Sequence, residues 1–464
     1  MTKKRMPWGV TIALMAITAA VTISLTYQFA MEKFNQSLSS LSERQAMYSK
    51  LDEVDRKVRE NFYGSIDEQN LNDSIAAGYV SGLGDAHSYY LTVEEYNKMQ
   101  NELAGKTVGI GIETQLRASG ELMVVRVYAN SPAALAGIQK GDVIVAVGDV
   151  TMAQNGYQAV REALVGEDGQ QVTVTVHRGD EEKQELAFDV TRGQFEIASV
   201  ESRVTAEGFG YIRITEFNDN TPDQFEAALT QLQQQNVAGL ILDLRNNPGG
   251  SLASVASILD TILPAGNIVS SEDKNGNQTV LYTSDAAQLS LPIAVLVNGD
   301  SASAAELMAC AIRDYKKGTL IGENTYGKGT MQQTFALTDG SAVSITIAKF
   351  NPPLSENFDG IGLMPDLQVS LTEEQKERFY FLSDDEDSQL KAAISRLSNE
   401  AGMGAGAVSG DGVSSSSGQT ASTSSESVPA AESITEEPAS TQVETVPSSE
   451  VAAYEADAKV TAIF

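Results

Sequence analysis

The residues that could do chemistry in this sequence are serines, a lysine and glycines rather than histidines or cysteines. Only two histidines occur, His87 and His177, in stretches that read as separate modules, and we interpret both as structural. The single Cys310 cannot form an internal disulfide or a cysteine-based zinc site. We therefore expect a catalytic base other than histidine.

The first candidate is the segment Asn298–Glu306, in which a buried strand runs into small residues that open a helix. Ser303 would lie in the positive end of the helix dipole, beside unpaired backbone N–H groups. That is a suitable position for a nucleophile. The alternative is an ordinary helix N-cap, which the local pattern alone favours.

The second candidate is the segment Gly322–Gly329, which imitates a phosphate-binding loop, with Leu240–Asp243 as its acidic strand partner. Gly329 stands where a magnesium-binding Ser or Thr is needed, and the segment leads into a strand rather than a helix. Both points argue against nucleotide binding. Lys328 is then either a surface lysine in a glycine turn or a lysine in a dry cleft.

The third candidate is the segment Leu242–Ser251, in which a strand runs into an Asn-Pro-Gly-Gly turn. Adjacent glycines such as Gly249 and Gly250 can present backbone N–H groups to a developing oxyanion. A simple turn is the alternative interpretation.

The length and charge of the chain limit what these segments can belong to. With 464 residues the chain is long enough for two to four domains. Acidic residues outnumber basic ones by 62 to 32, which gives a formal charge of −30. Such a charge repels phosphate backbones, so we expect no nucleic-acid partner.

The N-terminal segment predicts a membrane anchor. Lys3, Lys4 and Arg5 precede an uncharged, mostly apolar span from Met6 to Met31, which is long enough for a spanning helix. The basic leader places this end in the cytoplasm. We predict residues 1–33 as a leader and single-pass anchor in a bacterial-type cell membrane, with the remainder extracytoplasmic. A cleaved signal peptide is the alternative and would make the protein secreted.

Periodicity and turn signals divide the remaining chain into five regions. We predict a helical domain at 34–104, a half-β domain at 105–192, an α/β core at 193–372, a charged helical segment at 373–400 and a disordered Ser/Glu-rich tail at 401–464. In the core, strands and helices alternate, which predicts a mainly parallel sheet with its chemistry at the strand ends. The apolar Val460–Phe464 is either a chance exception in the tail or a ligand-like C-terminus.

Taken together, the three candidate segments resemble the C-terminal processing peptidases, or tail-specific proteases, of the serine-lysine class. The resemblance covers roughly residues 40–370 and includes Gly82–Tyr90, a PDZ-like domain from Val108 and the 25-residue separation of Ser303 and Lys328. Ala305 departs from the family, which often has a second Ser there. The resemblance implies an α/β multidomain fold whose core is a crotonase/Clp-like spiral, and chemistry that needs no metal or cofactor.

The resemblance also implies a role for each matching residue. These are Ser303 as nucleophile, Lys328 as general base, Gln332 as holder of the lysine amine, the N–H groups of Ala304 and of Gly249 or Gly250 as oxyanion hole, and Asp314 as a supporting acid. Glu306 is interpreted as structural. A lysine accepts a proton only when neutral, and burial in an apolar cleft lowers its pKa toward that state.

Substrate selection would fall to the PDZ-like domain. Its segment Val108-Gly109-Ile110-Gly111-Ile112 resembles a loop that captures a C-terminal carboxylate while the peptide adds to the sheet as a strand. The same residues would also fit a plain glycine turn. The predicted function is a membrane-anchored serine endopeptidase that recognises exposed C-terminal tails of proteins and cleaves through an acyl-enzyme. A catalytically silent tail-binding adaptor is the alternative, and the helical ends could support a homodimer. We also hypothesise that the domain gates the active site and that it binds Phe464 of another copy.

Overall fold

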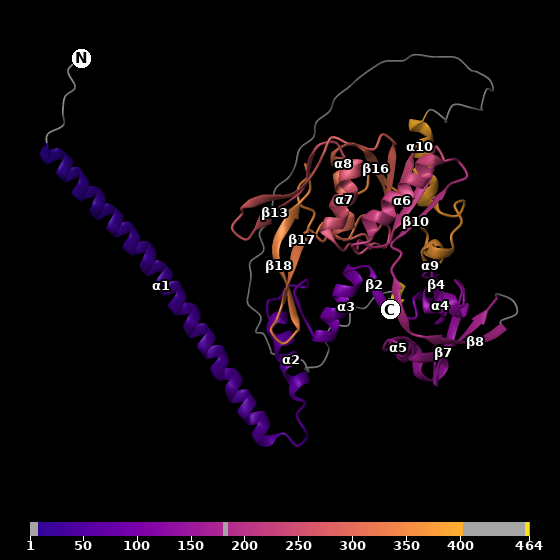
Figure 1. The fold of residues 1–464 in the computed structure, drawn as a ribbon, viewed down its shortest axis with the longest axis horizontal. Coiled ribbons are helices and arrows are strands. Elements are labelled where there is room, and N and C mark those ends of the chain that lie inside the picture. Colours follow the sequence, from indigo (N-terminus) through magenta and orange to yellow (C-terminus); the bar gives the residue numbers. More distant parts are fainter. Residues whose placement is uncertain (1–7, 180–183, 402–459, 464) are drawn as a thin grey trace, which may run out of the picture. The chain divides into compact units, whose positions relative to one another are not determined.

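The computed structural model describes residues 8–179, 184–401 and 460–463 (Figure 1). The chain forms two compact units, residues 1–76 and 77–464. Apart from residue 401 and residues 460–463, the tail predicted to be disordered lies outside the described residues. The candidate catalytic segments all fall in the second unit.

The first unit is helical. Helix α1 spans Trp8–Asn61, and α2, Glu68–Ser81, begins within this unit. Near the end of α1, Arg59 forms an ion pair with Glu68 at 2.6 Å. In the part of the chain that the structure describes, no helix combines the length and apolarity needed to cross a membrane. The predicted spanning helix is therefore not confirmed.

The central element of the second unit is a six-stranded sheet in the order β10-β11-β12-β15-β16-β19. Its strands are β10 (Val200–Val204), β11 (Gly210–Ile214), β12 (Leu240–Asp243), β15 (Ile293–Val297), β16 (Gly318–Gly322) and β19 (Leu367–Gln368). All pairs from β11 to β19 are parallel, and only β10 runs antiparallel to its neighbour. This is the mainly parallel sheet that the alternation of strands and helices predicts.

Helices cover both faces of this sheet. The covering helices are α6 (Thr221–Gln234), α7 (Leu252–Ile262), α8 (Ala304–Asp314) and α10 (Ser388–Glu400). Leu240 and Leu242 of β12 pack into the same cluster as residues of α6, α7 and α8, whereas Ile241 between them packs with residues of α10. Alternate side chains of a strand point to opposite faces, so a run of apolar residues fills both layers.

The segment predicted as one charged helical stretch at 373–400 is interrupted. It consists of a short helix α9 (Glu373–Glu377), a 3₁₀ turn η1 (Phe379–Phe381) and α10. Asp387 caps α10 by accepting hydrogen bonds from the N–H groups of Gln389 and Leu390. The break places this carboxylate in the protein interior, where it meets Arg245 at 2.8 Å.

A second, antiparallel sheet lies beside the first in the order β1-β18-β13-β14, with β17 also paired to β18. Its strands are β1 (Tyr89–Leu91), β13 (Gly266–Asp273), β14 (Gln278–Ser284), β17 (Thr330–Ala336) and β18 (Ala342–Asn351). The β1–β18 pairing sets Tyr89 opposite Ser344. The turn before β1 therefore lies next to the strands that follow Lys328. Helix α3 (Val93–Leu103) follows β1 and begins with a capping box formed by Thr92 and Glu95.

The half-β region forms a third sheet in the order β20-β3-β4-β5-β7-β8, with β6 paired to β5. Its elements are β3 (Ile112–Leu116), β4 (Leu122–Val127), α4 (Pro132–Ala136), β5 (Val143–Val147), β6 (Val150–Thr151), α5 (Met152–Leu164), β7 (Gln171–Arg178), β8 (Gln184–Thr191) and β20 (Val460–Ile463). Its own core includes Ile112, Val124, Val160 and Val174. Strands β2 (Lys106–Gly109) and β9 (Gly193–Glu196) pair with each other in a separate two-stranded ladder. In the chain, β2 comes just before β3 and β9 just after β8.

Candidate active site

The three candidate segments are the loops that leave three neighbouring parallel strands. Strands β12, β15 and β16 are adjacent in the sheet, and their carboxyl ends therefore lie at one edge. The loops are bonded to one another there: the N–H of Ala302 donates to the carbonyl of Asn247 at 2.9 Å, and the N–H of Tyr326 donates to the carbonyl of Ser301 at 3.1 Å. The fold thus brings together residues that lie far apart in the sequence.

Ser303 occupies the turn from β15 into α8 in a strained backbone conformation. Its φ of 55° and ψ of −114° lie outside the extended region that N-cap residues usually adopt. For a non-glycine residue such a conformation costs on the order of 1–3 kcal/mol and persists only where surrounding contacts impose it. Behind it, Ala304, Ala305 and Leu307 are buried and hold the first turn of α8 in the core. The geometry differs from that of an ordinary cap.

Glu306 is the residue that ties the serine to the lysine segment. Its Oε2 accepts the backbone N–H of Ser303 at 2.8 Å and the backbone N–H of Lys328 at 2.9 Å. Its Oε1 accepts the N–H of Gly327 at 2.7 Å and the hydroxyl of Thr325 at 2.5 Å. Burial raises the pKa of this carboxyl, and the four donors act in the opposite direction. One fully buried carboxylate therefore fixes both candidate catalytic residues.

The Lys328 side chain is half-buried and lines a cavity. Burial lowers the pKa of its amine, because desolvation penalises the charged form, and the Asp85 carboxylate opposes this by favouring the ammonium. Among the described residues, no hydrogen bond joins Lys328 Nζ to Ser303 Oγ. The direction of the pKa shift is the one that a lysine base requires.

The Asn-Pro-Gly-Gly turn lies against the serine. A Cβ atom added to Gly249 would lie 2.9 Å from Ser303 Cβ and 3.0 Å from the nitrogen of Ala304, so the turn approaches as closely as only glycine allows. The N–H of Gly249 donates to Asn247 Oδ1 at 2.8 Å. The N–H groups of Gly250 and Ala304 have no acceptor within the described parts of the chain. Of the two glycines, Gly250 is therefore the one with an N–H available to an oxyanion.

Buried polar side chains fix this glycine turn. Arg245 forms ion pairs with Asp243 at 2.6 Å and with Asp387 at 2.8 Å, and all three side chains are nearly fully buried. Asn247, which is also fully buried, donates from Nδ2 to the carbonyl of Ile214 at 2.9 Å. Removing one partner from such a network leaves a buried charge or polar atom unpaired, which is strongly destabilising. The turn is therefore held in place before a substrate arrives.

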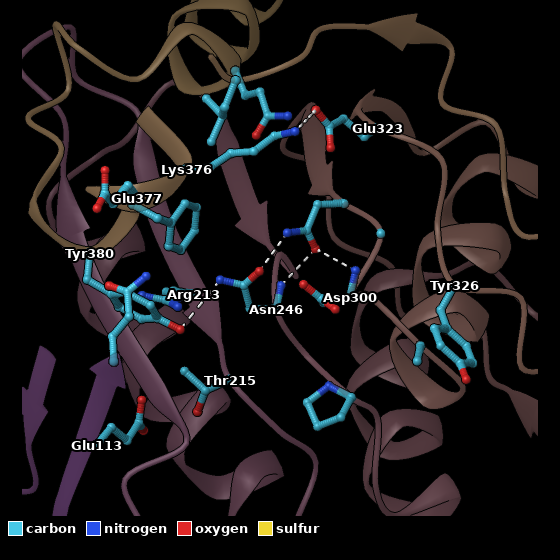
Figure 2. Close-up of a pocket in the computed structure, with 18 of the residues that line it drawn as sticks. Glu113, Arg213, Thr215, Asn246, Asp300, Glu323, Tyr326, Lys376, Glu377 and Tyr380 are labelled. Carbon is cyan, nitrogen blue, oxygen red and sulfur yellow. Dashed lines mark hydrogen bonds and ion pairs between the residues drawn. The ribbon is translucent and has the colours of Figure 1, made fainter. Parts of the chain in front are cut away.

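A cavity of about 1380 Å³ adjoins these loops (Figure 2). Its wall combines Glu113 from β3, Arg213 from β11, Asn246 from the turn after β12, and Tyr380 from η1, as the close-up shows. Lys328 and Ala302 also line it, and Ser303 is the residue that follows Ala302 in the chain. The cavity extends from the half-β region to the candidate lysine, and it is large enough for several residues of an extended peptide.

The remaining predicted site residues lie at different distances from this centre. Gln332 on β17 donates from Nε2 to the hydroxyls of Thr330 and Thr346, at 2.9 and 3.1 Å, and is not bonded to Lys328. Asp314 ends α8 about three turns beyond Ser303, where it accepts the N–H groups of Leu354 and Ser355. It supports the chain that follows β18 rather than the serine.

The predicted tail-binding loop connects β2 to β3 at the edge of the half-β sheet. Gly111 has a φ of 81°, and a Cβ there would lie 2.3 Å from the Cβ of Ser131, so the loop requires glycine at this point. Val108 is half-buried, and Gly109, Ile110 and Ile112 are buried with Gly111. The loop leads directly into β3, whose Glu113 reaches the cavity.

Sequence reasoning missed two residues that shape the site. The sequence interpretation treats Glu306 as structural, although its position three residues after Ser303 is the spacing of a capping-box acid and is a usable signal. Asp85 falls within the Gly82–Tyr90 segment, to which the sequence assigns no catalytic role, and the β1–β18 pairing brings that segment toward Lys328. No local pattern in the sequence predicts that approach.

The family model of peptidase family S41 matches residues 208–369, and that of the PDZ domain matches residues 123–178. A probable CtpA-like serine protease of Staphylococcus haemolyticus is 30% identical over 365 residues, which cover 78% of this chain and 71% of the relative.

Two solved structures are also similar. The photosystem II D1 C-terminal processing protease has 30% sequence identity and a TM-score of 0.44, over 68% of this chain and 86% of that one. A putative S41 protease from Bacteroides fragilis has 18% identity and a TM-score of 0.52, over 74% of this chain and 93% of that one. The second likeness is one of fold.

Proposed function

The chain belongs to peptidase family S41 and is a serine-type peptidase with a PDZ domain, and from this premise we propose that Ser303 and Lys328 form its catalytic dyad. Family membership confirms the resemblance drawn from the sequence. The observation that carries the proposal is the Glu306 carboxylate, whose Oε2 accepts the N–H groups of both residues. It supports a site in which nucleophile and base are positioned by one buried group.

The reaction follows from the groups present. Neutral Lys328 takes the proton of Ser303 Oγ as the oxygen attacks a peptide carbonyl carbon, and the N–H groups of Ala304 and Gly250 stabilise the resulting oxyanion. The lysine then returns the proton to the departing amine, which leaves an ester on Ser303. Water, deprotonated by the same lysine, hydrolyses that ester and restores the serine. Gln332 would hold the amine once the substrate has drawn it toward Ser303.

The substrate enters, in this proposal, as an extended protein chain through the cavity. Its C-terminal tail pairs with the PDZ domain at the loop Val108-Gly109-Ile110-Gly111-Ile112 and β3, and the segment upstream reaches the catalytic loops. The cavity wall supports this path because it includes Glu113 of β3 together with Lys328. The lack of a Ser303–Lys328 hydrogen bond agrees with a dyad that closes only when a substrate is bound.

The test uses the full chain and an unfolded protein substrate with and without an apolar C-terminal tail. We expect the parent to cleave the tailed substrate, and Ser303→Ala and Lys328→Ala to be folded by circular dichroism yet reduced at least about 1000-fold in kcat/KM. Lys328→Arg is the matched control that keeps the charge but cannot serve as a base. Cleavage by any of the three variants at the parental rate would refute the assignment of Ser303 and Lys328 as the catalytic dyad. Tail binding without cleavage by the parent would favour the adaptor function.

The peptidase is further proposed to be anchored in a membrane by the apolar span Met6–Met31, with its catalytic part outside the cytoplasm. The support is the basic leader Lys3-Lys4-Arg5 and the uncharged span after it. In a bacterial host the full chain should sediment with membranes and be digested by protease added to spheroplasts. Recovery of the intact chain in the cytoplasmic fraction would refute the anchor. The homodimer stays a prediction.

A further inference from the structure

The chain supplies its own strand to the edge of the PDZ-domain sheet. Strand β20, Val460–Ile463, pairs antiparallel with β3 over four residues, with Val460 opposite Gln115 and Ile463 opposite Ile112. This contact joins parts of the sequence that are about 350 residues apart.

Strand β3 is the edge at which an extended peptide would be added. Its other side is paired with β4, so without β20 its outward N–H and C=O groups would form an open sheet edge. Extended peptides bind PDZ domains by completing such an edge with backbone hydrogen bonds. Strand β20 therefore occupies the position that the proposed function gives to a substrate tail.

The direction of β20 is also that of a bound tail. Because the pairing is antiparallel and ends with Ile463 opposite Ile112, the strand runs toward the loop that contains Gly109 and Gly111. A substrate tail captured at this loop would run the same way along β3. The two cannot pair with the same edge at once.

We propose that residues 460–463 are an intramolecular competitor of substrate tails, which must displace this strand from β3 to be processed. The proposal rests on the proposed function, since it takes the β3 edge to be the site where substrate tails dock. It adds a regulatory element that the family assignment does not contain: the enzyme's own chain sets the threshold for tail recognition.

Chain length permits this pairing. The connection from α10 to β20, residues 401–459, is 59 residues long, and a chain of that length can span at most about 200 Å. Because the strand belongs to the same chain as β3, its effective concentration at that edge is on the order of 1 mM. A strand that binds with a Kd on the order of 0.1 mM would then weaken the apparent binding of free tails about tenfold.

Contacts of β3 connect its occupied edge with the catalytic region. Glu113, opposite Ala462 in the ladder, accepts hydrogen bonds from Tyr128 at 2.7 Å and from Arg126 at 3.1 Å. Arg126 in turn donates to Thr215 at 3.3 Å, and Thr215 lines the cavity. Occupation of β3 therefore takes place at one wall of the substrate path.

The primary experiment measures binding without catalysis. In the Ser303→Ala background, a fluorescent peptide of sequence Val-Thr-Ala-Ile-Phe is titrated with the full chain, with a chain lacking 460–464 and with a matched control lacking 441–445. We expect the 460–464 deletion to bind the peptide about tenfold more tightly than the full chain and the control to bind like the full chain. Equal affinity of all three chains, or no binding to any, would overturn the proposal.

Two further measurements separate this inference from the proposed function. In the active enzyme, the 460–464 deletion should lower KM for a tailed substrate and leave hydrolysis of a short tail-less peptide unchanged; an unchanged KM would count against the competitor. Failure of the parent to cleave would refute the proposed function, and the peptide-binding result would still decide whether β20 competes with tails for β3. The affinity should not depend on protein concentration over a hundredfold range, because a dependence would assign β20 to another copy and refute the intramolecular pairing.

Discussion

Hydrogen bonds fix the groups around Ser303, whereas in the loop that carries Lys328 they fix the backbone and Thr325 but not the lysine amine. On the serine side, Asn247 and Glu306 fix the glycine turn and the start of α8. On the lysine side, the N–H groups of Gly327 and Lys328 are bonded to Glu306, but within the described chain no hydrogen bond holds the amine. Nucleophile and oxyanion donors are thus in place in the free protein, and the base has freedom to move.

This difference has a physical reason. An oxyanion hole contributes most when its donors are positioned before the charge develops, because no reorganisation is then needed. A lysine base must lose its charge and reach the serine, and both depend on the desolvation that a bound substrate brings. A rigid serine side and an adjustable lysine side are therefore compatible with control of the enzyme by substrate binding.

The largest effect is expected where the two sides meet, at Glu306. In Glu306→Gln the amide can accept at one oxygen only, and its NH₂ group faces donors, so at least two of the four hydrogen bonds are lost. We expect kcat/KM to fall at least about 100-fold and the free energy of unfolding to fall by about 1–3 kcal/mol. Thermal denaturation and peptide hydrolysis measure the two effects.

The matched control for Glu306 is Glu323→Gln. Glu323 also lines the cavity, but it is only partly buried and its ion pair with Lys376 is long, at 3.8 Å. This variant should stay within about twofold of the parent, as expected for a weak exposed pair. Equal losses in both variants would mean that Glu306 has no special position in the site.

A smaller effect, confined to the serine side, is expected from Gly249→Ala. The added methyl would lie 2.9 Å from both Ser303 Cβ and the carbonyl oxygen of Ala302, and the φ of 105° is itself unfavourable for alanine. Displacing the turn should lower kcat about 10- to 100-fold, with less change in KM, because the oxyanion donors act in the transition state.

Gly276→Ala is the control for backbone strain alone. Its φ is 80°, and a Cβ there would meet nothing within 4 Å, since it lies in the turn between β13 and β14. This change should cost some stability and leave kcat unchanged. A parental kcat in Gly249→Ala would show that the turn is not part of the oxyanion hole.

The local structure of the site could be predicted from the sequence. The sequence pattern predicts a helix at Asp223–Gln235, where α6 spans Thr221–Gln234, and a strand at Ile293–Asn298, where β15 spans Ile293–Val297. These elements carry strong apolar periodicity, so local pattern suffices. The edge at which the three loops meet follows from the parallel strand order, which the alternation of strands and helices indicates.

Long-range contacts could not be predicted in the same way. The hairpin β13–β14 was not anticipated, and Gln332 bonds two threonines where the family pattern implied the lysine amine. Asp85 is brought toward the site because Ser88 and Thr346, 258 positions apart, are hydrogen-bonded. Such contacts depend on how finished sheets pack, and a window of neighbouring residues does not contain that information.

The smallest expected effect is on the lysine side and is a shift in pH dependence. Burial lowers the pKa of Lys328, and the Asp85 carboxylate partly reverses this by stabilising the ammonium. In Asp85→Asn that stabilisation is lost, so the pKa of Lys328 should fall further and the neutral base should persist to lower pH. The acidic limb of the kcat/KM profile should therefore move to lower pH, while the basic side stays unchanged.

Asp339→Asn is the control, because that exposed turn carboxylate is bonded to Ser341 and does not act on Lys328. Asparagine at position 85 keeps an acceptor for the N–H of His87, so a shift without loss of stability would isolate the charge effect. A limb that moves to higher pH would mean that the group titrating in the profile is not a lysine amine countered by Asp85. An identical limb in parent and variant would place the adjustable base beyond the reach of this carboxylate, and the contrast between the two sides of the site would then rest on hydrogen bonding alone.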